Sequence, residues 1–117
     1  MRPLQLTRCV IDTAVLTLAA PGELSAGTIL ARDTVTAKLV LYVKRGFSSG
    51  NGTAKAVLAH AVSAAAAGDQ HVRVIFGGVV DERQLVVAAG EDRVVDWTVT
   101  DQLRRYSITP SRPDYSC

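Results

Sequence analysis

The chain has 117 residues, of which 48% are hydrophobic, 21% charged and 5% aromatic, and its formal net charge at pH 7 is +2. This length accommodates one ordinary domain with its own core, and the composition excludes an intrinsically disordered chain. The basic residues are scattered along the sequence. Nucleic-acid-binding proteins usually combine a basic face with stacking aromatics, so no dedicated role in binding DNA or RNA is expected.

The N-terminal residues 1–20 are predicted to form an extended arm. Apolar residues there are separated by threonines and charged residues, a pattern that favours extended structure over helix. The apolar positions are Leu4, Leu6, Val10, Ile11, Val15, Leu16 and Leu18. Arg8 and Asp12 interrupt this stretch where a signal peptide would need a continuous apolar run. Nowhere does a run approach the roughly 18 apolar residues of a membrane helix.

The body of the domain is expected over residues 21–109. Short strands are predicted at residues 28–32 and 38–44, followed by a glycine-rich loop over residues 45–52. Residues 53–70 are ambiguous because their many alanines favour a helix, whereas the glycines at both ends suit a strand. We predict a strand at residues 55–61 and an alanine-rich connection after it.

The second half of the body is predicted to combine strands and short helical turns. Residues 71–76 alternate between unlike side chains as a strand with two different faces does, and Gly77 and Gly78 are predicted to end the strand or form a bulge. A helical turn is predicted to follow from residue 81, then a strand at residues 93–100. A short helix capped by Thr100 comes next. Residues 110–117 contain two prolines and are predicted to form a loosely held tail.

Residues for catalysis or metal binding are not evident in the sequence. Ser63, His60 or His71, and Asp69 could be combined on paper into a nucleophile set, but no G-x-S-x-G elbow surrounds the serine. The loop GFSSGNG lacks the spacing and the lysine of a phosphate-binding loop. We therefore predict no enzymatic activity, no cofactor and no metal.

The cysteines and the single tryptophan each allow more than one interpretation. Cys9 and Cys117 lie at opposite ends of the sequence and do not form the framework of a small secreted domain, so we expect free thiols in a reducing compartment. Trp97, the single tryptophan, is expected in the core, with a role as a contact residue as the alternative.

The order of these elements resembles the head decoration proteins of tailed bacteriophages, the lambda-like capsid-stabilising family. The similarity covers roughly residues 20–108. It is carried by Gly27–Leu30, Lys38–Tyr42, Ala56–Leu58, Gly68–Asp69, Val72–Val79 and Glu82–Leu85. Ala56 stands where the family often has glycine, and Leu41 stands where it has proline or a polar residue. The arm also differs from the lambda type in length and composition.

This resemblance implies a mainly β single domain, a small barrel or sandwich with one or two short helices and an extended arm. It implies a trimer, with a dimer as the variant, that binds the major capsid protein on the outside of the expanded phage head. The arm residues named above are the candidate capsid-binding residues. Further candidates for subunit or capsid contacts are Leu24, Phe47, Phe76 and Trp97. A tail or fibre-attachment module and a small hydrolase are the alternatives.

The expected location is the exterior of the virion, reached after synthesis and assembly in the cytoplasm of the bacterial host. Neither a membrane nor a nucleic acid is expected as a partner.

Overall fold

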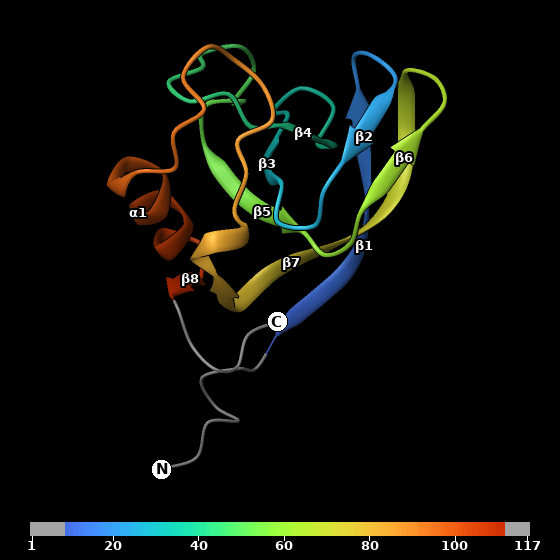
Figure 1. Cartoon of the computed structure of the whole chain (residues 1–117). Helices are drawn as coiled ribbons and strands as arrows, with labels where there is room; N and C mark the ends of the chain where they lie inside the picture. Colours follow the sequence, from blue (N-terminus) through green and yellow to red (C-terminus); the bar gives the residue numbers. More distant parts are fainter. Residues whose placement is uncertain (1–8, 112–117) are drawn as a thin grey trace.

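The computed structural model describes residues 9–111, which form a closed β-barrel flanked by one helix (Figure 1). Five strands make the barrel, in the order β1-β4-β3-β5-β7, and pairing of β1 with β7 closes it. They are β1 (Val10–Leu18), β3 (Ile29–Arg32), β4 (Leu39–Leu41), β5 (Ala54–Leu58) and β7 (Gly68–Asp81). Closure removes the exposed strand edges through which open sheets aggregate.

The long strand β7 joins the barrel to the rest of the domain. Its first part pairs antiparallel with β1, from Leu18 opposite Gly68 to Val10 opposite Gly77. Its last part, from Gly78 onward, pairs parallel with β8 (Ile108–Ser111) beside the barrel. A separate two-stranded sheet consists of β2 (Gly22–Leu24) and β6 (Val62–Ala64).

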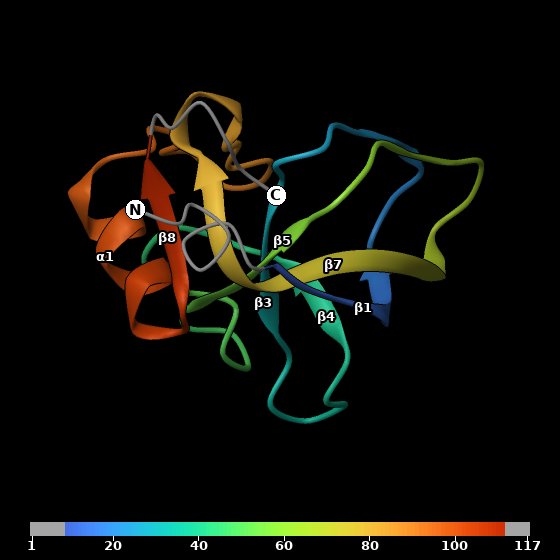
Figure 2. The same ribbon diagram turned by 90° about the horizontal axis from the view of Figure 1, so that it is seen from below.

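One α-helix, α1 (Trp97–Arg105), lies with β8 at one side of the barrel (Figure 2). The side chain of Asp96 caps the helix by accepting a hydrogen bond from the backbone N–H of Thr98. Val99 and Leu103 are buried against the barrel. A short 3-10 helix, η2 (Glu82–Gln84), follows β7. None of the helices in residues 9–111 is long and apolar enough to cross a membrane.

Two apolar cores lie on opposite faces of β3 and β5. Small and medium aliphatic residues fill the inside of the barrel, and we call this set the barrel core. Its buried members are Leu16, Leu18, Leu30, Leu39, Ala56, Leu58, Ala64, Val72 and Val74. The second set, the outer core, lies between the barrel wall, α1 and the segment after β7. It comprises Ile29, Ala31, Tyr42, Ala54, Val57, Ile75, Val80, Leu85, Val87, Val99, Leu103 and Ile108.

The predicted fold class, a mainly β single domain, is confirmed. The strand predictions at residues 28–32, 38–44 and 55–61 correspond to β3, β4 and β5, although the real strands are shorter. The strand predicted at residues 93–100 is wrong because α1 begins at Trp97. The helix begins earlier than predicted and its cap is Asp96 rather than Thr100.

The structure also changes the boundary of the expected arm. Residues 10–18 form β1, and Leu16 and Leu18 belong to the barrel core, so this part of the chain is a wall of the domain and not a free segment. Leu4 and Leu6 lie outside the described residues. At the other end, Pro110 and Ser111 belong to β8, and the rest of the expected tail lies outside the described residues.

The bonding state of Cys9 also differs from the expected one. It is disulfide-bonded in this structure, so the prediction of a free thiol at this position is wrong. Cys117 lies outside the described residues.

Candidate binding surface

Large apolar side chains are exposed at the end of the molecule where the loops of residues 43–53 and 88–96 meet. The side chain of Phe47 is 98% exposed, and Val94 and Trp97 are also largely exposed. Figure 1 shows the two loops next to each other, at the end remote from the start of β1. The isolated bridge between Val43 and Ala89 joins them directly. We call this region the loop end.

A buried lysine holds the loop end together. Lys44 Nζ donates to Asp96 Oδ2 at 2.8 Å and to the Val94 carbonyl oxygen at 3.1 Å, and it lies 3.2 Å from Asp92 Oδ2. Only 2% of the lysine side chain is exposed. The hydrogen bond from Lys44, together with one from Thr98, lowers the pKa of Asp96 well below its usual range. The lysine therefore fixes the loop that carries Val94 and the start of α1.

A second surface lies where β1 begins. The side chain of Val10 is 56% exposed and those of Ile11 and Tyr106 somewhat less. A Cβ at Gly77 would lie 3.3 Å from Val10 Cγ2 and 3.6 Å from the Ser107 carbonyl oxygen, so the start of β1 and the turn after α1 are neighbours. Two neighbouring segments, the start of β1 and the turn after α1, thus each expose an apolar side chain.

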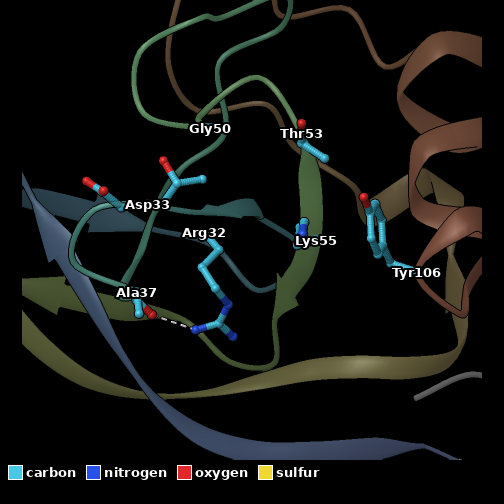
Figure 3. Close-up of a pocket in the computed structure, with 8 residues that line it drawn as sticks. Arg32, Asp33, Ala37, Gly50, Thr53, Lys55 and Tyr106 are labelled. Atoms are coloured by element: carbon cyan, nitrogen blue, oxygen red, sulfur yellow. Dashed lines mark hydrogen bonds between the residues drawn. The ribbon is translucent and has the colours of Figure 1, made fainter.

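A pocket of about 310 Å³ opens beside this second surface (Figure 3). Residues from β3, β5, the adjoining loops and the turn after α1 line it. They are Arg32, Asp33, Thr34, Ala37, Gly50, Thr53, Lys55 and Tyr106. We call it the bulge pocket, because each of the two β-bulges of the barrel contributes a side chain to it or to its support.

One of the two register shifts in the barrel pairings lies in the wall of this pocket, and the other lies at Phe76, whose ring is next to Arg32. Ile11 pairs with Ile75 but Val10 pairs with Gly77, which leaves Phe76 as the extra residue of β7. Likewise Leu30 pairs with Ala56 but Ala31 pairs with Ala54, which leaves Lys55 as the extra residue of β5. β-Bulges change the direction of a side chain and are common beside functional sites. Here they supply an aromatic ring and a cation.

The residues predicted as subunit or capsid contacts lie in different parts of the molecule and differ in exposure. Phe47 and Trp97 are exposed at the loop end, which shows that the prediction of a core position for Trp97 is wrong. Phe76 is half-buried beside the bulge pocket, and Leu24 is half-buried in β2, where it pairs with Val62. Among the arm residues, Val10 and Ile11 are exposed and Val15 is half-buried, whereas Leu16 and Leu18 are buried.

The candidate catalytic residues do not assemble into a nucleophile set. Nε2 of His60 accepts a hydrogen bond from the Arg73 backbone N–H at 3.2 Å. The carboxylate of Asp69 accepts hydrogen bonds from Lys38 and Thr17, which lower its pKa. Within residues 9–111, no hydrogen bond joins Ser63 to either His60 or Asp69.

The closed barrel thus exposes two apolar regions, and its described residues contain no assembled nucleophile set. The model of the bacteriophage lambda head decoration protein D family matches residues 8–108. This match covers most of the chain, so the chain belongs to that family, as the sequence resemblance predicted. No curated protein and no solved structure shows a significant match.

Proposed function

We propose that this protein cements the head of a tailed bacteriophage. It would bind the outer surface of the expanded head, bridge neighbouring major capsid subunits and stabilise the shell against the pressure of the packaged DNA. Family membership over residues 8–108 carries this proposal. The exposed apolar side chains at both ends of the barrel support it, because a bridging protein needs more than one contact surface.

The direct test mixes purified protein with undecorated expanded heads. We expect the protein to sediment with the heads and to raise the temperature at which they are disrupted. Unexpanded procapsids are the matched control, since the proposal assigns binding to the expanded shell. Failure to bind expanded heads would contradict the proposal, and equal binding to procapsids would contradict the stated timing.

We propose further that the N-terminal arm contributes to capsid binding, and the structure limits which residues can be removed to test this. Residues 10–18 form a barrel strand, so a truncation of the arm that included them would destroy the domain. The appropriate truncation removes residues 2–8. An extended segment can add a strand to an exposed edge of a partner sheet, where backbone hydrogen bonds supply the affinity. We expect this truncated protein to stay folded and to lose head binding, whereas full binding by it would refute the role of the arm.

Self-association would multiply weak contacts with the shell. A trimer holds three binding surfaces together, so the second and third surfaces bind at high effective concentration. An interface of about 800 Å² per partner is ordinary for stable complexes. Phe47 and Trp97, exposed at the loop end, are candidate subunit contacts. Sedimentation analysis of the free and head-bound protein distinguishes a trimer from a dimer or a monomer.

A tail or fibre-attachment module is the alternative virion role. Labelled protein would then be found at the tail and not across the head surface. A small hydrolase is disfavoured, because the family is structural and the candidate residues Ser63, His60 and Asp69 do not form hydrogen bonds with one another.

A further inference from the structure

The bulge pocket carries two cations that no described acidic residue neutralises. Arg32 on β3 and Lys55 on β5 both line it, and neither forms an ion pair within residues 9–111. Both residues are only half exposed. Partial burial of an unpaired cation costs free energy, and a bound negative charge would offset that cost.

Both cations are held in place by aromatic rings. The guanidinium of Arg32 lies 5.8 Å from the centre of the Phe76 ring, and the Lys55 ammonium lies 4.6 Å from the centre of the Tyr106 ring. Arg32 Nη1 also donates to the Ala37 carbonyl oxygen (Figure 3). A cation that is already oriented loses less side-chain entropy when it binds a ligand.

The acidic residue in the pocket wall is turned away from the cations. Asp33 Oδ1 accepts hydrogen bonds from the backbone N–H groups of Val35 and Thr36, at 2.8 and 3.2 Å. Figure 3 shows its carboxylate directed away from Arg32 and Lys55. Asp33 therefore stabilises its own turn and leaves the positive charge of the pocket available.

The rest of the pocket supplies polar groups and space. Thr34 and Thr53 place hydroxyl-bearing side chains in the wall. Gly50 has a φ of +85°, and a Cβ there would lie 2.8 Å from Thr34 Cγ2, so a glycine is required for the loop to form this wall. The cavity of about 310 Å³ accommodates a group as small as a side chain.

We propose that the bulge pocket is a carboxylate-binding site, and that it receives an aspartate or glutamate side chain of the shell protein; this second part rests on the proposed cementing function. Arginine binds carboxylates through two parallel hydrogen bonds, and Lys55 adds a second positive charge. The pocket is one isolated site and not a basic track, so it suits a single acidic side chain better than a nucleic-acid backbone. It lies beside Tyr106, itself close to the exposed start of β1, so one partner surface can contact both.

The first experiment tests the site without any phage head. Sodium acetate is titrated into isotopically labelled protein at constant ionic strength, and the backbone amide resonances of Thr34, Gly50 and Thr53 are followed. We expect saturable shifts in the wild type that are lost in Lys55→Gln and retained in Lys55→Arg. Arg73→Gln is the matched control, because this exposed strand residue forms no ion pair among the described residues. Absence of saturable shifts, or shifts with phosphate only, would overturn the carboxylate site.

The second experiment tests the occupant. We expect Lys55→Gln and Arg32→Gln each to weaken binding to expanded heads by about tenfold or more, because each removes a charged hydrogen bond. Arg73→Gln should bind as the wild type does, and thermal unfolding identifies any variant that has lost its fold. Wild-type affinity in both pocket variants would overturn the shell carboxylate as occupant. If the wild type itself ignores heads, the cementing function fails together with this occupant, and the acetate titration alone decides the site.

Discussion

The barrel core and the outer core share β3 and β5 but are built differently. The barrel core consists of leucine, valine and alanine side chains enclosed by a ring of strands. The outer core is covered by a nine-residue helix, the short strand β8 and the segment after β7, which lie outside the closed ring of strands. We infer from this difference that the barrel determines the free energy of global unfolding, whereas α1 and β8 can open locally while the barrel stays folded.

The largest effect is expected from a cavity in the barrel core. Leu16 is fully buried on the strand that closes the barrel, where neighbouring strands cannot move inward independently. Leu16→Ala should lower the free energy of unfolding by about 3–5 kcal/mol, measured by urea denaturation. Val35→Ala, at a residue that is 80% exposed, is the control and should change it little. A loss below about 1 kcal/mol would contradict the assigned role of β1.

A cavity in the outer core should cost less and act locally. Leu103 is fully buried under α1, but the short helix can shift to fill part of the space. We expect Leu103→Ala to lower the free energy of unfolding by about 2–3 kcal/mol. Hydrogen exchange should accelerate in α1 and β8 while amides of β3 and β5 stay protected. Uniform acceleration through the whole barrel would show that the two cores open as one unit.

The contribution of Lys44, at the loop end, to the free energy of unfolding is expected to depend on pH. Because Lys44 lowers the pKa of Asp96 below the usual 3.8, the folded protein is stabilised by this pair above about pH 4. The stabilisation is lost as the pH falls further towards the lowered pKa. Lys44→Met should therefore be less stable at pH 6, by a smaller margin than the cavity variants, and should lose less on acidification to pH 3. Urea denaturation at both pH values measures the difference, and equal acid sensitivity would refute it.

The smallest effect on stability is expected at the most exposed aromatic residue. The side chain of Phe47 is 98% exposed, so Phe47→Ser should change the free energy of unfolding by less than about 0.5 kcal/mol. If the loop end is a subunit interface, the same variant should weaken self-association in sedimentation experiments. Unchanged association would remove Phe47 from the candidate contacts.

Local sequence patterns predicted the strands in which buried and exposed side chains alternate regularly. The alternation in residues 71–76 predicted the middle of β7, because Val72 and Val74 face the barrel core while His71 and Arg73 face solvent. The first part of the alanine-rich stretch was correctly assigned to a strand against its helix propensity, because Ala56 is small enough for the crowded barrel interior. The connection predicted after it was wrong at residues 62–64, which form β6. Tertiary packing thus overrides propensity where a closed barrel leaves little room.

The candidate binding surface was less predictable. Phe47, Phe76 and Trp97 were among the candidate contacts, but Trp97 was expected in the core. It is exposed because it is the first residue of α1, directly after the capping residue Asp96. Arg32 and Lys55 were missed altogether. Lys55 and Phe76, whose ring lies against Arg32, are the residues that partner strands skip, and no local sequence pattern indicates where such a register shift occurs.

Closure of the barrel by β1 also has a consequence for biosynthesis. Thr17 and Asp69, whose side chains are hydrogen-bonded across the closing strands, are separated by 52 positions in the sequence. During synthesis β1 must therefore wait, unpaired on this side, until β7 has emerged from the ribosome. Contacts between such distant segments slow folding and expose an apolar strand in the meantime. We expect nascent chains that end before β7 to depend on chaperones, although the finished domain does not.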